Sequence, residues 1–421
     1  MSFQQGLSGL NASSKNLEVI GNNVANANTV GAKASRAEFA DMYASALNGA
    51  GTTSIGIGVN LAAVTQQFTQ GNITTTENPL DLAINGNGFF EVTNGTQTLY
   101  TRNGQFQANK DGNIVNSAGL KLMGYPADDQ GVIQPGAARA LQLPTGGVDP
   151  NQTSEVNVEM NLDSRLATTA PAAAVTPQID FNDAATYNNA TSISVYDAKG
   201  QDVAVTYYFQ KSGTDTWNVY ATANGVTLAG TAAAPTPVTS ITFPADGSAP
   251  TAPTGPVAIT IPATVNSAGA ATLAIPGVQL DLTKTTQFGS PFGVTDMSQD
   301  GYAAGKLASL SIEKSGIVMA TYSNGQSKPA GQIELASFRN PQGLSPLGGN
   351  VWARTFASGD PTVGTPSTGN LGALQASALE ESNVDLTGEL VDMITAQRVY
   401  QANAQTIKTQ DAVLQTLVNL R

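Results

Sequence analysis

The chain contains no cysteine and no histidine, and only 12% of its 421 residues are charged. These absences exclude thiolate nucleophiles, imidazole bases, Ser-His-Asp triads, zinc sites of the usual kinds and common haem ligation. No stretch approaches the roughly 18 consecutive apolar residues of a membrane helix, and the N-terminus lacks the basic and apolar regions of a secretory signal. We therefore expect no membrane insertion and no cleaved signal peptide, so export would need a dedicated machine.

The charges that are present are mostly acidic. Nineteen basic and 31 acidic residues give a net charge of −12, and no basic cluster occurs. Nucleic acid is an unfavourable partner, because such binding relies on lysine and arginine releasing counterions from phosphates. The sequence is instead rich in glycine and proline, with 43 and 21 residues, and its length suits two or three domains.

Apolar residues recur at helical spacing at both ends of the chain, from Ser2 to about Ala27 and from Leu386 to Leu420. Asp385 stands where an N-cap is expected for the second helix. The two apolar seams are Phe3, Leu7, Leu10, Leu17 and Val24, and Leu386, Leu390, Met393, Tyr400, Ala404, Ile407, Leu414 and Val418. Burial of these seams alone does not offset the entropy of ordering two long helices. We predict that the helices pair and also contact neighbouring subunits.

The faces beside these seams carry uncharged amides instead of lysine and glutamate, notably Asn22, Asn23 and Asn26. A solvated single helix normally carries charge there, and amides are buried at lower cost than charges. We interpret these three residues as assembly contacts. The alternative, that they are polar surface positions, stays open.

The sequence between the helices indicates β-structure. Asn-Gly and Asp-Gly pairs between apolar runs predict a β-meander from Leu80 to Pro126, and a similar texture returns from Leu307. A proline-rich region separates the two. We predict a mixed, multi-domain fold with paired N- and C-terminal α-helices, coiled-coil-like, plus nested all-β domains. The predicted domains are residues 1–70 with 363–421 (helical), 71–144 with 285–362 (a split inner β domain), and 145–284 (an inserted outer β domain).

No motif supports catalysis. Residues 85–90 contain a G-x-G without the third glycine of a nucleotide site, and residues 109–113 resemble part of a calcium loop without its distal glutamate. We interpret both as tight turns. The carboxylate pairs Asp128-Asp129 and Glu380-Glu381 are interpreted as solvated surface. We expect no enzyme activity, catalytic residue, metal or cofactor.

Residues 10–33, LNASSKNLEVIGNNVANANTVGAK, resemble the N-terminal signature of bacterial flagellar axial proteins, the rod and hook group. Residues 382–404, SNVDLTGELVDMITAQRVYQANA, are similar to the matching C-terminal signature. Residues 79–90, 100–106, 331–333 and 340–344 look like segments that the family shares in its inner β domain. The large central insertion favours the hook branch, and distal rod proteins are the nearest alternative.

The resemblance implies a structural subunit that assembles into a helical, flexible tube, the flagellar hook. Such a tube transmits torque from rod to filament as a universal joint around a central export channel. The implied partners are further copies of the chain, the rod, the hook cap, the hook-filament junction proteins and the type III flagellar export apparatus, and the implied location is extracellular. From a different class, a secreted β-rich adhesin or carbohydrate-binding protein stays an alternative, given the Thr, Asn and Gly content of the middle region.

Overall fold

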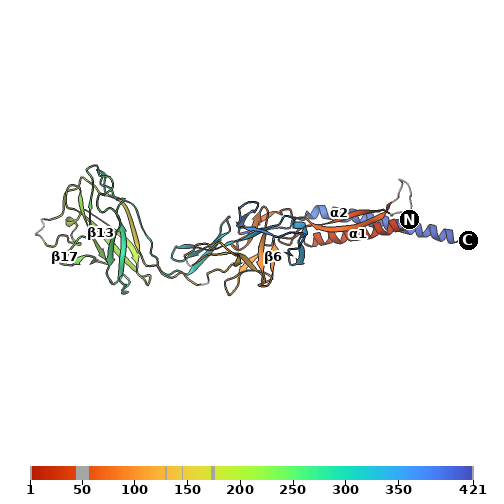
Figure 1. The fold of residues 1–421 in the computed structure, drawn as a ribbon, viewed down its shortest axis with the longest axis horizontal. Coiled ribbons are helices and arrows are strands. Elements are labelled where there is room, and N and C mark those ends of the chain that lie inside the picture. The colour runs from red at the N-terminus through yellow and green to blue at the C-terminus, as the bar shows by residue number, and fades with distance from the viewer. Residues whose placement is uncertain (1, 44–55, 129, 145, 172–175, 420–421) are drawn as a thin grey trace. The chain divides into compact units, whose positions relative to one another are not determined.

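The computed structural model of the chain describes residues 2–43, 56–128, 130–144, 146–171 and 176–419 (Figure 1). Their contacts form two compact units. The first unit consists of Met1–Thr145, Ser309–Thr321 and Ser327–Arg421, and the second consists of Gly146–Ala308 and Tyr322–Gln326. Terminal helices and nested β units confirm the predicted fold class.

The first unit contains the helices α1 (Ser2–Ala25) and α2 (Leu386–Asn419) and many short strands. The strands before the second unit are β1 (Ser35–Tyr43), β2 (Gly56–Gln66), β3 (Ile73–Thr75), β4 (Leu82–Asn85), β5 (Phe89–Thr93), β6 (Thr98–Thr101), β7 (Phe106–Ala108), β8 (Ile114–Asn116), β9 (Lys121–Pro126) and β10 (Arg139–Ala140). Those that follow it are β22 (Leu307–Ile312), β23 (Ile317–Tyr322), β24 (Ser327–Ile333), β25 (Leu335–Ser337), β26 (Ser345–Gly348), β27 (Val351–Ala353), β28 (Thr362–Gly364), β29 (Ala373–Ala376) and β30 (Ala378–Glu380), with a 3-10 turn η2 (Pro341–Gly343).

Both predicted helices are present with nearly the expected ends. Neither segment contains proline, so nothing interrupts the backbone hydrogen bonds of either helix. Asp385 caps α2 as predicted, because its Oδ1 accepts a hydrogen bond of 3.1 Å from the backbone N–H of Thr387. No helix in the described ranges is long and apolar enough to cross a membrane.

The main sheet of the first unit runs in the order β22-β23-β24-β9-β5-β6-β27-β26. Phe89 and Phe90 are adjacent on β5, so their side chains project to opposite faces of the sheet. Phe90 belongs to the main hydrophobic core with Leu122 and Leu335. Phe89 belongs to an aromatic cluster with Tyr100, Phe338 and Trp352. The sheet is therefore covered on both faces at β5.

The two chain ends also meet through strands. β29 pairs antiparallel with β4, and β30 pairs antiparallel with β3. The segment that leads into α2 is thereby held against the segment that follows β2. The interpreted turns are confirmed as well: Asn109 Oδ1 accepts hydrogen bonds from the N–H groups of Asp111 and Asn113, and residues 86–88 connect β4 to β5.

The second unit is built from a four-stranded and a five-stranded sheet around one core, with β16 and β17 forming a small separate sheet. Its strands are β11 (Glu155–Asn161), β12 (Asn189–Tyr196), β13 (Asp202–Lys211), β14 (Thr216–Ala223), β15 (Val226–Thr227), β16 (Gly230–Thr231), β17 (Ala234–Pro235), β18 (Thr239–Thr242), β19 (Val257–Ile261), β20 (Ile275–Asp281) and β21 (Gly293–Gln299), with a 3-10 turn η1 (Ala184–Thr186). Trp217 is fully buried in the shared hydrophobic cluster, and its Nε1–H donates to Gln287 Oε1 at 2.7 Å. The unit continues past residue 284 because β21 pairs with β11.

Candidate assembly interface and adjoining polar junction

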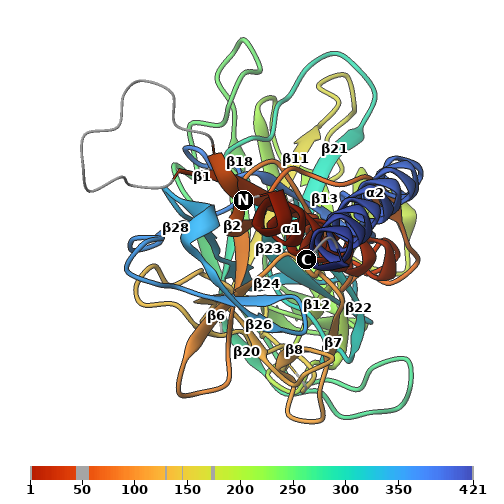
Figure 2. The ribbon, with the colours of Figure 1, turned by 90° about the vertical axis from the view of Figure 1, so that its right-hand side faces the viewer.

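Helices α1 and α2 lie side by side and run antiparallel (Figures 1 and 2). A Cβ added at Gly6 would lie 3.2 Å from Ile407 Cγ1, and one at Gly9 would lie 2.9 Å from Asn403 Nδ2. These glycines therefore let the two helices approach closely. Towards the other end of α1, the buried Ser13 and Ile20 line a groove of about 500 Å³ together with the buried Ala396 of α2.

The predicted seam residues divide into half-buried and exposed groups. The half-buried ones are Leu10, Leu17, Val24, Met393, Ala404 and Ile407. The exposed ones are Phe3, Leu7, Leu386, Leu390, Tyr400 and Leu414, with exposed fractions from 37% to 53%. Val418 lies in α2, but its side chain is outside the described part of the structure. Half of the described seam residues thus stay available to another molecule.

Sequence reasoning missed four further large apolar residues that α2 exposes, which are Val391, Ile394, Val399 and Val413. They lie outside the single heptad seam that the periodicity indicated. A second apolar set beside the first is the signal that could have identified them. A helix that is apolar on several sides is one that other protein covers.

Among the predicted amides, Asn23 is buried and joins three elements. Its Nδ2 donates to Glu389 Oε1 of α2 at 2.9 Å and to the carbonyl of Ser35 at 2.8 Å, and its Oδ1 accepts from the N–H of Ser35. Asn22 is exposed and Asn26 is half-buried, and Asn26 Nδ2 donates to the carbonyl of Asn22 at the helix end. Asn23 therefore fixes α2 against α1 and β1 within one chain.

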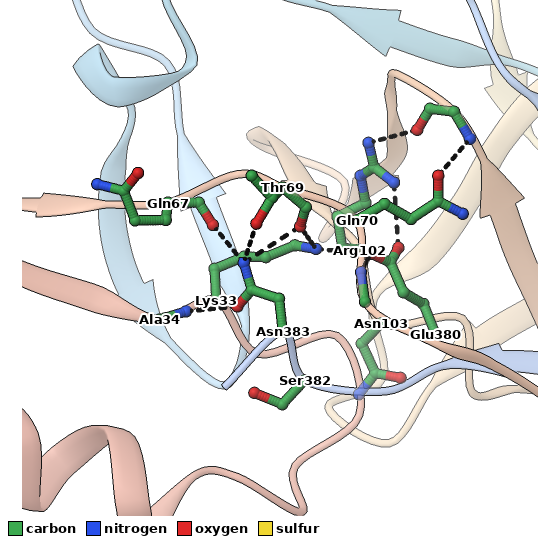
Figure 3. Close-up of polar contacts among 12 residues, drawn as sticks. Lys33, Ala34, Gln67, Thr69, Gln70, Arg102, Asn103, Glu380, Ser382 and Asn383 are labelled. Atoms are coloured by element: carbon green, nitrogen blue, oxygen red, sulfur yellow. Dashed lines mark hydrogen bonds and ion pairs between the residues drawn. The ribbon is translucent and has the colours of Figure 1, made fainter. Parts of the chain in front are cut away.

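A buried ionic cluster lies beside this helix pair, and Figure 3 shows its three side chains pointing toward one another. Lys33 Nζ lies 2.6 Å from Glu380 Oε1, and Arg102 Nη1 lies 3.0 Å from Glu380 Oε2. The side chains of Lys33 and Glu380 are fully buried, and that of Arg102 is 5% exposed. Glu380 also accepts from the N–H of Gly71 at 3.0 Å. One carboxylate thus binds three segments that are distant in the sequence.

Burial and charge act against each other in this cluster. Burial lowers the pKa of the Lys33 ammonium group, and the charge and hydrogen bond of Glu380 oppose that shift. Burial likewise lowers the pKa of Arg102, and Glu380 again opposes it. Both cations also have neutral acceptors, since Lys33 donates to the carbonyl of Thr69 and Arg102 donates to that of Gly86. Glu380 therefore offsets part of the cost of burying these two cations.

Asn383 lies between this ionic cluster and α2, and we call the cluster together with Asn383 the polar junction (Figure 3). Its Nδ2 donates to the carbonyl of Gln67 and to Thr69 Oγ1, both at 2.7 Å, and its Oδ1 accepts from the N–H of Ala34 at 2.7 Å. Gly31 has a φ of +71°, and a Cβ there would lie 2.6 Å from the backbone N of Asn103. The chain after α1 is therefore held directly against the chain that precedes α2.

The interpretation of Glu380-Glu381 as solvated surface is wrong for Glu380. Adjacent residues at a strand end project to opposite sides, so Glu380 is buried while Glu381 is exposed. Asp128 is exposed in a turn, as interpreted, and Asp129 lies outside the described residues. The scarcity of charge could have identified the cluster, since Lys33 and Arg102 are isolated cations within the quoted signature segments.

Four family models match the chain. They are the Flagella basal body rod protein model at residues 3–33, the Flagellar hook protein FlgE/F/G D1 domain at 83–201, the Flagellar basal body protein FlaE D2 domain at 161–302, and the Flagellar basal body rod FlgEFG protein C-terminal model at 375–420. The polar junction and both helices lie largely in the terminal matches.

Sequence similarity to known proteins extends over the whole chain. The flagellar hook protein FlgE of Salmonella typhimurium is 42% identical over 424 residues, and that of Escherichia coli K12 is 41% identical over 427 residues, each covering all of both chains. A crystal structure of Helicobacter pylori flagellar hook protein FlgE2 has a similar fold, with a TM-score of 0.52 at 14% identity, covering 73% of this chain and all of that one. From its two terminal helices to its inserted β unit, this chain belongs to the family of flagellar hook proteins.

Proposed function

We propose that the chain is a structural subunit of the flagellar hook and that its copies polymerise through apolar side chains of α1 and α2. Gly6 and Gly9 of α1 allow close contact with Ile407 and Asn403 of α2 within one chain, whereas several large apolar residues of both helices stay exposed. Each such side chain that a neighbour covers contributes about 1.5–3 kcal/mol. This exposure is the observation that carries the proposal.

The proposed contact consists of the predicted seam residues of both helices, extended to the additional apolar residues of α2. Leu414 lies beyond the intramolecular helix pair. Gly6 is opposite Ile407 and Gly9 is opposite Asn403, so each step toward the start of α1 moves one step along α2. On this register Ser2 lies opposite Asp411, so Leu414 extends past the described part of α1.

In the proposed tube, the helical domain of residues 1–70 and 363–421 forms the inner wall around an export channel. Exposed uncharged amides, such as Asn11, Gln401 and Gln405, would face that channel. Sparse charge on such a wall avoids binding the proteins that pass through it. The β-structure of the first unit adjoins this wall within the same unit.

We further propose that the subunit transmits torque as part of a universal joint. β surfaces with few ion pairs can slide against each other without losing strong fixed contacts. The partners in this proposal are the rod, the hook cap, the junction proteins and the type III flagellar export apparatus. In this proposal the location is extracellular, and the role is structural and not catalytic.

Full-length similarity to hook proteins favours this function over the two alternatives. A distal rod protein would not need so large an inserted unit, which spans Gly146–Ala308. A secreted adhesin or carbohydrate-binding protein would not need terminal helices with exposed apolar side chains. The remaining question is whether those side chains drive assembly.

Removing residues 414–421 should leave a folded chain that no longer polymerises. The expected reason is that Leu414, at the start of this segment, is 53% exposed, so in the proposed tube its removal costs contacts between chains. Electron microscopy of concentrated protein measures tube formation, and circular dichroism checks the fold. Tubes of normal yield from the truncated chain would contradict the assigned role of α2.

Removing the second unit should preserve tube formation and change the curvature or stiffness of the tubes. The excision is feasible because Val148 and Gly305 exchange backbone hydrogen bonds of 2.8 and 3.0 Å, so residues 148 and 305 can be joined by a short linker. Electron microscopy of the tubes measures both properties. Unchanged bending would exclude the inserted unit from the joint.

A further inference from the structure

Phe356 has an exposed fraction of 105%, the highest of any large apolar residue in the described ranges. It lies in the connection between β27 and β28, in a segment of residues 354–360 that we call the Phe356 turn. A phenylalanine at this exposure is not packed against the other residues that the structure describes. Leaving such a side chain in water forgoes the burial energy that the fold gains from its other aromatic residues.

The backbone that presents Phe356 is held by hydrogen bonds on both sides of it. Thr355 Oγ1 accepts from the N–H groups of Ala357 and Ser358 at 3.1 and 3.3 Å. Ser358 Oγ accepts from the N–H of Thr355 at 3.0 Å and donates to its carbonyl at 2.9 Å, and Ser358 is 1% exposed. Because the turn is already ordered, it loses little conformational entropy when a partner binds it.

The Phe356 turn is also fixed to the body of the first unit. Thr355 Oγ1 donates to the carbonyl of Gly343, and Asn340 Nδ2 donates to the carbonyl of Ala357 at 3.1 Å. A Cβ at Gly343 would lie 2.6 Å from the Ala357 carbonyl carbon, so the η2 turn packs directly on this backbone. An ion pair between Arg354 and Asp360 neutralises the charges on either side of Phe356.

We propose that Phe356 is an inter-subunit contact residue, which inserts into an apolar surface of a neighbouring copy of this chain. This inference rests on the proposed function, because it names a contact of the same polymer. A copy is the favoured partner because the proposed function already brings copies of the chain together. Two chains of net charge −12 repel each other, and the Phe356 turn adds nothing to that repulsion because Arg354 and Asp360 pair within it.

The position of the turn in the sheet agrees with this assignment. The turn connects β27 to β28. β26, which pairs with β27, ends the strand order, and β28 pairs with β25, so β26 and β28 lie at margins of the sheet. Both carry further exposed apolar residues, with Leu347 at 56% and Val363 at 46%. A neighbouring subunit that covers Phe356 can extend its contact to these side chains.

The test is polymerisation of the full chain with substitutions at this turn. Phe356→Ser should raise the critical concentration for polymerisation at least tenfold, and Phe356→Trp should keep it within about threefold of wild type. Ala357→Ser, on the same turn, should leave it unchanged. Monomer melting should be the same in all variants, because Phe356 has no intramolecular packing to lose. An unchanged critical concentration for Phe356→Ser would overturn the inference.

A second measurement identifies the partner. A photo-crosslinking benzophenone amino acid at position 356 should join two copies of the chain under polymerising conditions and not in dilute monomer. Polymers that form normally without such crosslinks would refute the Phe356 contact and leave the hook function standing. A wild-type chain that forms no tubes would instead overturn the proposed function, and this inference with it.

Discussion

Glu380→Gln should destabilise the folded chain by about 3–5 kcal/mol, because it leaves two buried cations without their shared carboxylate. Lys33 Nζ and Arg102 Nη1 each lie within 3.0 Å of this carboxylate, and burial opposes the charged form of both cations. Glutamine keeps the side-chain shape and an oxygen that can accept from the N–H of Gly71. The decrease in the free energy of unfolding therefore measures the effect of removing the negative charge and not of changing the side-chain volume. Urea unfolding of the monomer at pH 7 measures it.

The neighbouring carboxylate supplies a matched control. Glu381 is exposed and adjacent in sequence, so Glu381→Gln should change the free energy of unfolding by less than about 0.5 kcal/mol. Hydrogen exchange adds a local readout, since residues 31–35 and 69–71 should lose protection in the Glu380 variant. Equal stability of the two variants would show that the ionic cluster contributes nothing to holding the chain ends together.

The helices could be predicted from the sequence because the apolar spacing and the Asp385 cap are local signals. The face that joins them could not. Gly6 and Gly9 make that contact by lacking a side chain, and a hydrophobic pattern registers only residues that have one. The seam of large residues was read correctly as apolar, but the fold leaves Phe3 and Leu390 exposed.

The ionic cluster escaped prediction for a different reason. Its members are separated in the sequence by 69 residues between Lys33 and Arg102 and by 278 between Arg102 and Glu380. The long-range pairings of β30 with β3 and of β29 with β4 fix the segment that carries the carboxylate, and no local sequence signal indicates them. No local rule decides which of two adjacent glutamates is buried at a strand end, whereas the turn at Asn109 followed from residues within five positions.

A second pair of buried carboxylates gives the first unit an unusual dependence on pH. β25 pairs with β5 at Leu335↔Phe90, so the next position along this register places Glu334 opposite Glu91. Glu91 Oε2 and Glu334 Oε2 are buried without a hydrogen-bond partner among the described residues, whereas Glu334 Oε1 accepts from the Tyr125 hydroxyl at 2.8 Å. Burial, and then the charge of Glu334, raises the pKa of Glu91 from 4.5 to about 7. Burial also raises the pKa of Glu334.

The sign of the effect follows from proton binding. Between pH 4.5 and 7 the folded chain holds a proton on Glu91 that the unfolded chain has released, so the free energy of unfolding falls as pH rises. The stabilisation is complete below pH 4.5 and is lost above about pH 7. A shift from 4.5 to about 7 corresponds to about 3 kcal/mol. Asp163 has the opposite effect and acts at lower pH. Hydrogen bonds from Arg165 lower its pKa to about 2, so its contribution to the free energy of unfolding is lost as the pH falls toward that value.

Glu91→Gln separates this contribution from all others, because glutamine mimics the protonated carboxyl at every pH. The variant should match the wild type near pH 4 and exceed its free energy of unfolding by about 3 kcal/mol at pH 8, a rare case of a buried substitution that stabilises. Urea titrations across this range measure the difference, and Glu77→Gln, at an exposed carboxylate, should show none. A difference between wild type and Glu91→Gln that does not change with pH would mean that folding does not raise the pKa of Glu91, so that this carboxyl is ionised in the folded chain at neutral pH.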